Sequence, residues 1–111
     1  KIYFEKAQLN GGVHMDKIAL MLRPIDNVAT VVDDVLKGDN VYVNKEGEKI
    51  CVSAFEDIPA YHKIALEDLK TGDKVIKYGQ VIGAMTADAV KGSWISHKNI
   101  MSLPRNYEDE L

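Results

Sequence analysis

Several short segments of the chain alternate between apolar and polar residues, which is typical of strands with one buried face. These segments are bounded by Gly, Pro, Asn or Asp, the residues that most often make turns. We therefore predict a succession of short strands. They span residues 17–23, 41–43, 49–54, 74–78, 80–84 and 94–96.

Turn and helix signals complete this pattern. The segment 44–48 (NKEGE) separates two predicted strands and has the composition of a hairpin turn. Residues 31–36 and 64–69 could each form one or two helical turns, but neither segment is long enough to be a stable helix alone. The predicted fold class is mainly β, with one or two short helices.

One short pattern occurs three times. It is DVLKGDNV at 34–41, DLKTGDKV at 68–75 and DAVKGSWI at 88–95. Each copy predicts a short turn, a glycine that can adopt a positive φ, and a strand entered on an apolar residue. The alternative is that Asp and Gly are simply common in turns. The shared spacing favours a small, convoluted β fold whose corners are built alike.

Size and charge limit the function classes. With 111 residues the chain has the length of a single domain, and it is too small to surround a deep active site by itself. The net charge is −3, and acidic and basic residues are interleaved, as at 45–49. Nucleic-acid binding needs clustered Lys and Arg, so no nucleic-acid partner is expected.

Further expectations concern location and domain boundaries. Cys51 is the single cysteine, so an internal disulfide is impossible, and we interpret it as a packed thiol. No apolar run reaches the length of a membrane span, and cytoplasm is the expected location. Residues 1–14 are expected to be an expression tag or disordered leader, 15–100 the domain, and 101–111 a tail or linker.

A family resemblance rests on several motifs that occur in order. The segment 58–66 (IPAYHKIAL) resembles a characteristic segment of the SAF domain of altronate and galactarate dehydratases. The similarity extends from about residue 16 to Asn99 and implies a β-clip fold. The other matching motifs are 24–29 (PIDNVA), 77–79 (KYG), 82–84 (IGA) and 92–99 (GSWISHKN).

The resemblance also implies a function. In this family the domain is the N-terminal part of a long dehydratase or a separate small subunit, and a larger chain completes the active site. The implied reaction is loss of water from a sugar acid, aided by a divalent metal, iron or manganese, shared with the larger chain. A related pair of subunits removes sulfite from sulfolactate. The alternative is a non-catalytic SAF binding or assembly module, and exposed strand edges leave a homo-oligomer possible.

Two residues are the catalytic candidates. His62 follows a proline-containing loop, and an imidazole suits proton transfer or metal ligation at neutral pH. Lys63 is the second candidate, and Lys77 is a candidate for holding a substrate carboxylate. The local alternatives are a surface or capping histidine and solvated lysines.

The remaining substrate-binding candidates are Asp26, Asn27, His97 and Asn99. For Asp26 and Asn27 the alternative is local capping of the next turn. Trp94 is interpreted as a core or interface anchor.

The sequence departs from the family pattern at three positions. Tyr61 replaces a family glycine, and Ser96 and Lys98 replace a pair of family histidines. In an extended strand, residues 96 and 98 would face one side and His97 the other.

Overall fold

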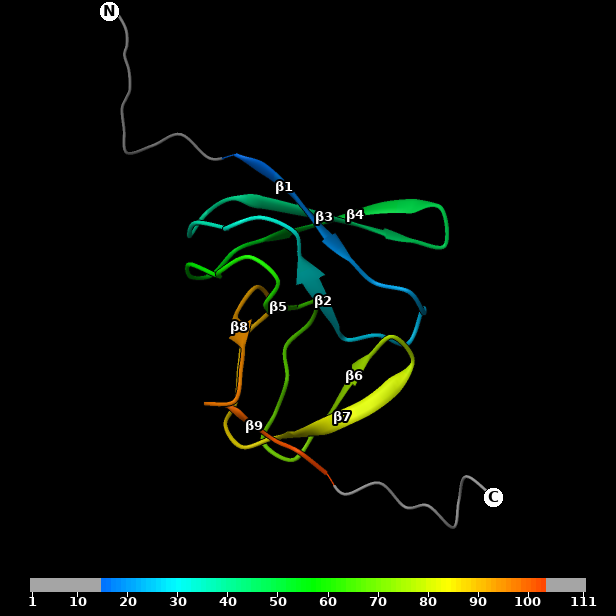
Figure 1. Cartoon of the computed structure of the whole chain (residues 1–111), viewed down its shortest axis with the longest axis vertical. Helices are drawn as coiled ribbons and strands as arrows, with labels where there is room; N and C mark the ends of the chain where they lie inside the picture. The colour runs from blue at the N-terminus through cyan, green and yellow to red at the C-terminus, as the bar shows by residue number, and fades with distance from the viewer. Residues whose placement is uncertain (1–14, 104–111) are drawn as a thin grey trace, which may run out of the picture.

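The structure is a computed structural model and describes residues 15–103. This part of the chain contains strands and turns but no helix (Figure 1). The strands are β1 (Asp16–Leu20), β2 (Val28–Val31), β3 (Asn40–Lys45), β4 (Glu48–Ser53), β5 (Lys63–Ala65), β6 (Lys74–Lys77), β7 (Gln80–Met85), β8 (Trp94–Ile95) and β9 (Ile100–Met101). The mainly β prediction is confirmed, and the arrangement agrees with a β-clip fold.

The strands form two sheets. One has six strands in the order β4-β3-β1-β2-β5-β8, and the other has three in the order β6-β7-β9. In Figure 1 the three-stranded sheet lies below the larger one. The buried Asn27 links them, because its side chain donates to the Lys74 carbonyl at 2.9 Å and accepts from the Ile76 amide at 2.7 Å.

Two apolar clusters form the core. The first lies within the larger sheet and includes Val31, Val41 and Ile64. The second lies where the two sheets meet and includes Val75 and Ile95. All five side chains are fully buried, and four of them belong to strands that follow a corner.

The repeated pattern forms four corners rather than three. The first (34–41), third (68–75) and fourth (88–95) corners each turn on a glycine with φ near 92°, at Gly38, Gly72 and Gly92. The second corner (57–64) has the same backbone hydrogen bonds, but Tyr61 occupies the glycine position with φ 69°. The sequence pattern missed this corner because the glycine was absent.

The corners are joined in two reciprocal pairs. In the first pair, Asp57 of the second corner accepts from the Lys37 amide at 2.8 Å, and Asp34 of the first corner accepts from the Ala60 amide at 2.9 Å. The third and fourth corners repeat this exchange through Asp88 and Asp68. The leading aspartate of each corner therefore satisfies a backbone donor in its partner.

The predicted short helices at 31–36 and 64–69 are wrong. Val31 belongs to β2 and pairs with Ala19 of β1, while Ile64 belongs to β5 and pairs with Ala29 of β2, and the residues after each strand form a bend leading into a corner. Short segments rich in β-branched residues gain more from strand pairing than from one isolated helical turn.

The remaining strand and boundary predictions have mixed outcomes. The predicted hairpin across 44–48 is confirmed by pairing of β3 with β4. The first predicted strand, 17–23, ends at Leu20.

The predicted domain bounds can be compared with the strands only in part. β9 extends the strands past residue 100, while 1–14 and 104–111 lie outside the described residues. Between residues 15 and 103, no helix is long and apolar enough to cross a membrane.

Candidate functional site

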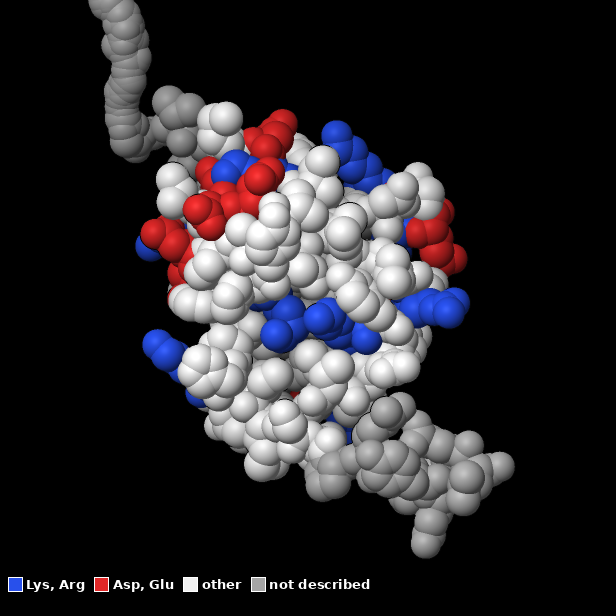
Figure 2. Space-filling model, in the orientation of Figure 1, with Lys and Arg blue, Asp and Glu red and all other residues white. Residues whose placement is uncertain are grey.

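Two lysines distant in sequence come together where the sheets meet. Lys63 begins β5, opposite Thr30 of β2, and Lys77 ends β6. Both are half-buried, and the charge of Lys77 acts on Lys63. Figure 2 shows Lys and Arg side chains gathered in a band across the middle of the molecule, where β2, β5 and β6 lie in Figure 1.

The environment of Lys63 perturbs its ionisation. Burial lowers the pKa of the Lys63 ammonium, and the positive charge of Lys77 lowers it further. An acidic ligand placed between the two lysines would relieve this repulsion and favour the charged form of Lys63. The pair can therefore bind a carboxylate, and Lys63 is easier to deprotonate than an ordinary lysine.

Tyr78 and Thr30 complete this cluster, and the sequence did not single out their side chains. The Tyr78 hydroxyl lies 3.2 Å from Thr30 Oγ1, and the Lys77 ammonium lies 5.2 Å from the centre of the Tyr78 ring. Tyr78 has φ 54° because Tyr78 and Gly79 form the tight turn between β6 and β7. The cluster places two ammonium groups and two hydroxyls close together.

His62 forms a separate pair with Trp94. The Trp94 indole N–H donates to His62 Nδ1 at 3.2 Å, and the rings meet edge to face with centroids 5.3 Å apart. Trp94 pairs with Ile64, whereas Lys63 pairs with Ile95. Because neighbouring residues of a strand point to opposite faces, His62 and Trp94 lie on the face of β5 opposite to Lys63. The structure does not bring the two catalytic candidates into one cluster.

A groove adjoins the histidine–tryptophan pair. It has a volume of about 360 Å³ and is formed by the first two corners together with Trp94. Its acidic side chains, Asp34 and Asp57, are occupied by the reciprocal hydrogen bonds between those corners. His62 is exposed and does not itself line this groove, and its side chain has Trp94 as its partner among the described hydrogen bonds.

Asp26 and Asn27 use their side chains to hold the backbone. Asp26 accepts hydrogen bonds from the amides of Leu22, Arg23 and Gly79 at 2.7–3.1 Å. Burial raises the pKa of Asp26, but these backbone hydrogen bonds outweigh it and hold the pKa below its usual value. Asn27 uses both ends of its amide to join the two sheets. The described hydrogen bonds thus hold the preceding turn and the second sheet and not the next turn, and substrate binding by either residue stays a prediction.

The segment around His97 is a turn rather than a strand. β8 ends at Ile95, so alternation of faces does not apply to residues 96–98. Asn99 closes the turn by accepting from the Ser96 amide at 2.7 Å and donating to the Trp94 carbonyl at 2.9 Å. The Ser96 hydroxyl accepts from the Lys98 amide at 3.2 Å. His97 is exposed at the tip, and its binding role stays a prediction.

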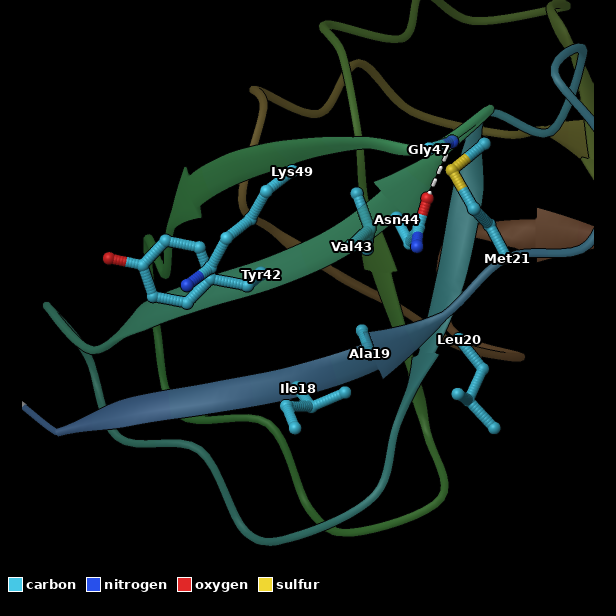
Figure 3. Close-up of a pocket in the computed structure, with 9 residues that line it drawn as sticks. All are labelled: Ile18, Ala19, Leu20, Met21, Tyr42, Val43, Asn44, Gly47 and Lys49. Atoms are coloured by element: carbon cyan, nitrogen blue, oxygen red, sulfur yellow. Dashed lines mark hydrogen bonds between the residues drawn. The ribbon is translucent and has the colours of Figure 1, made fainter.

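Cys51 is exposed, so its interpretation as a packed thiol is wrong. It lies on the outer face of β4 opposite Tyr42, which itself pairs with Ile18 of β1. A groove of about 330 Å³ lies beside this face, between β1 and the β3–β4 hairpin (Figure 3). Its polar side chains are already engaged, since Asn44 accepts from the Gly47 amide and the Lys49 ammonium lies over the Tyr42 ring. None of the predicted site residues lines it.

The described residues do not fit a self-contained metal centre. Within 15–103 no group of three or more His, Cys, Asp or Glu side chains is placed to hold a metal ion. Divalent metals in lyase-type sites need several oxygen or nitrogen ligands at once.

Comparison with known protein families places the chain in one of them. Residues 17–103 match the altronate/galactarate dehydratase SAF domain family. The chain belongs to that family, as the sequence motifs predicted.

The similar proteins are lyases of two kinds. Altronate dehydratase of Escherichia coli is 34% identical over 80 residues, which are 72% of this chain and 15% of the enzyme. Galactarate dehydratase of the same organism is 34% identical over 77 residues, 68% of this chain and 14% of the enzyme. The (2R)-sulfolactate sulfo-lyase subunit alpha of Paracoccus pantotrophus is 42% identical over 57 residues, 51% of this chain and 85% of that subunit.

The coverage of each relative shows which part of it is similar to this chain. The match spans about one seventh of each dehydratase but most of the sulfo-lyase subunit alpha. The common part is therefore the SAF domain, and most of each dehydratase lies outside it.

Proposed function

We propose that this domain is the small subunit, or the N-terminal domain, of a lyase acting on a sugar acid or a related hydroxy acid. Its lysine pair would bind the acid group of the substrate, and a larger chain would complete the active site. The observation that carries the proposal is a half-buried cluster in which Tyr78 joins the two lysines, because its ring lies under the Lys77 ammonium and its hydroxyl bonds to Thr30, the strand partner of Lys63. Two like charges are not placed together in a folded protein without cost, and an anionic ligand is the simplest compensation.

The chemistry of such a reaction explains the need for two cations. Dehydration of a hydroxy acid and loss of sulfite from sulfolactate both remove a proton next to the carboxylate and expel a group from the adjacent carbon. Negative charge accumulates on the carboxylate as the C–H electron pair enters the new double bond. Ammonium groups held beside the carboxylate stabilise that charge without reorganising during the reaction.

Lys63 and Lys77 would have different roles. Lys77 would bind the carboxylate as a fixed positive charge. The hydroxyls of Tyr78 and Thr30 would exchange hydrogen bonds with substrate hydroxyls. Lys63, whose pKa is lowered by burial and by Lys77, is the better candidate for taking up a proton. The expected divalent metal, iron or manganese, stays a prediction and no step is assigned to it.

The experiment uses the domain together with the dehydratase-like or sulfo-lyase-like chain of its own organism. Elimination from altronate, galactarate and (2R)-sulfolactate is measured for the complex with wild-type domain and with Lys77→Met. We expect kcat/KM to fall by about 100-fold, as for loss of one charged contact in the transition state. Lys37→Met, on an exposed lysine of the first corner, is the matched control and should leave the rate unchanged.

A second candidate function is a non-catalytic binding or assembly module. The observation favouring it is the Ser96–Asn99 turn, where the positions of the family histidines are used for a hydroxyl cap and an exposed lysine. In that case the complex would still form, but Lys77→Met and Lys37→Met would have equal rates. A complex that is inactive on all three acids would contradict the lyase proposal itself.

A further inference from the structure

The side chains of Lys63 and Lys77 are joined through two hydroxyl groups. Lys63 lies directly opposite Thr30 in the antiparallel pair of β5 with β2, so both side chains project from the same face of the sheet. The Tyr78 hydroxyl lies 3.2 Å from Thr30 Oγ1, and the Lys77 ammonium lies 5.2 Å from the centre of the Tyr78 ring. One amine, one ammonium and two hydroxyls therefore form a continuous cluster where the two sheets meet.

This cluster favours a neutral amine at Lys63. The residue is half-buried, and burial lowers the pKa of its ammonium because the charged form loses water. The positive charge of Lys77 lowers the same pKa further. A lysine that is desolvated, or that lies next to another cationic group, has the environment of a nucleophilic lysine that attacks carbonyl compounds.

The reactions considered under the proposed function give one class of product. When a 2-hydroxy acid loses the proton at C2 and a leaving group at C3, an enol forms, and the enol tautomerises to a 2-oxo acid. This holds for loss of water from a sugar acid and for loss of sulfite from sulfolactate. The product has a carboxylate bonded directly to a carbonyl carbon. An ammonium that holds the carboxylate can therefore present the carbonyl carbon to a second lysine beside it.

We propose that Lys63 is a nucleophilic lysine that forms a reversible Schiff base with 2-oxo acids while Lys77 holds their carboxylate. The inference rests on the proposed function only for the class of acid. The neutral amine attacks the carbonyl carbon, and the carbinolamine then loses water. A C=N bond replaces the C=O bond, and the oxygen leaves with the two hydrogens of the amine, so no oxidant or reductant is needed. The amine that can take up a proton from the substrate can thus also retain the product.

The hydroxyls of the cluster suit this step. The Tyr78 O–H donates to Thr30 Oγ1, which leaves the hydrogen of Thr30 to be donated to another acceptor. A hydroxyl that donates to the carbonyl oxygen stabilises the negative charge that develops there as the amine attacks. Because Thr30 and Lys63 share one face of the sheet, the donor and the nucleophile can act on the same carbonyl group.

Reductive trapping tests the proposal on the free domain at neutral pH. Cyanoborohydride converts an imine to a stable secondary amine, pyruvate serves as the simplest 2-oxo acid, and peptide mass spectrometry locates the labelled lysines. We expect Lys63 to be labelled about tenfold faster than the exposed Lys37, the effect of one charged hydrogen bond to the carboxylate. Labelling of Lys63 no faster than that of Lys37 would overturn the inference.

Two variants in one strand test whether Lys77 holds the carboxylate. Lys77→Met should slow the labelling of Lys63 by pyruvate about tenfold, because the charged contact is lost. Lys74→Met, at an exposed position of the same strand, should leave the labelling unchanged. Equal labelling of Lys63 in the two variants would contradict the role of Lys77.

A second carbonyl compound tests the same role in the wild-type domain. Acetone has a carbonyl group but no carboxylate, so it should label Lys63 with a smaller preference over Lys37 than pyruvate does. An equal preference with both compounds would show that the carboxylate is not recognised, and this comparison needs no variant.

The last variant locates the imine at Lys63. Lys63→Arg keeps a positive charge but cannot form a Schiff base, so the fast phase of labelling should disappear while Lys37 is labelled as before. A fast phase that persists in Lys63→Arg would contradict the assignment. Labelling is measured without the larger chain, so its failure is distinguishable from failure of the proposed lyase function. A selectively labelled Lys63 in a domain whose complex eliminates none of the three acids would support the inference and contradict the function.

Discussion

The second and third corners have the same backbone hydrogen bonds but differ at six of their eight residues, and three of these differences change how the corner is held. The third corner has Lys70, Gly72 and Asp73, and it follows the turn rules of the fold. The second corner has Pro59, Tyr61 and His62 at the same places. Each difference removes part of a local stabilising arrangement. Pro59 has no amide to be capped, Tyr61 replaces a glycine suited to positive φ, and His62 replaces the capping carboxylate.

The difference shows where the fold gives up local stability for another purpose. Three corners use their side chains mainly to hold the chain, whereas the second corner presents Tyr61 and His62 to solvent. A left-handed conformation at a residue other than glycine costs about 1–2 kcal/mol. Such costs commonly occur at functional sites, which is consistent with a binding role for this corner.

The largest expected effect concerns the fourth corner, which has no space for a Cβ atom at Gly92. In Gly92→Ala the new Cβ would lie 2.2 Å from the Ser53 carbonyl oxygen, at a φ of 92°. We expect a loss of about 3–5 kcal/mol in the free energy of unfolding, from backbone strain and overpacking together. Urea denaturation measures it. The control is Gly72→Ala, where nothing lies within 4 Å of the new Cβ and only the strain remains.

The second-largest effect compares how much a capping aspartate and His62 contribute to the free energy of unfolding. Asp39 is buried and accepts from the Leu36 and Met15 amides at 2.9 Å. Asp39→Ala should lower the free energy of unfolding by about 2–3 kcal/mol, because two donors lose their acceptor. His62→Ala should change it by less than about 0.5 kcal/mol, as at an exposed site. Equal losses in the two variants would show that His62 supports its corner after all.

The same carboxylate makes stability depend on pH. Burial raises the pKa of Asp39, but backbone hydrogen bonds from Leu36 and Met15 and the charge of Lys17 outweigh it, so the pKa lies below its usual value of 3.8. A lowered folded-state pKa contributes stability that is present above pH 3.8 and is lost as the pH falls through the folded value. Thermal unfolding from pH 6 downward, compared with Asp39→Asn, should show a smaller acid loss in the variant.

The smallest effect concerns Tyr61. Tyr61→Gly removes the strain of a φ of 69°, but glycine adds freedom to the unfolded chain. The net result should be a gain of about 0.5 kcal/mol, measured by urea denaturation. A loss of more than 1 kcal/mol would instead mean that the Tyr61 side chain packs on the domain, in conflict with its exposed fraction of 78%.

Much of the fold could be predicted because its signals are local. Alternation and turn residues located β3, β4, β6 and β7, and the Asp-to-Gly spacing located three corners. The second corner escaped this pattern because Tyr61 replaces the glycine. Its Asp57 and Ile64, at the same spacing as in the other copies, were the signal that could have revealed it.

The site was predictable only in part, because its contacts join distant segments. His62 and Trp94 are 32 residues apart, and Tyr78 and Thr30 are 48 apart. No local periodicity shows that β5 pairs with β8, that Thr30 of β2 lies beside Tyr78, or that Lys63 and His62 fall on opposite faces of β5. The family motifs indicated individual residues but not their grouping.

The most direct test of the account is the ionisation of Lys63 with and without an acid ligand. NMR titration of ¹³Cε-labelled lysines in the free domain should show the pKa of Lys63 below that of ordinary lysines, through burial and Lys77. Saturating galactarate, or the acid that the complex eliminates fastest, should raise that pKa, because a neighbouring carboxylate favours the charged ammonium. An unperturbed Lys63 in the free domain, or the same value with every acid present, would contradict the lysine pair as the acid-binding site.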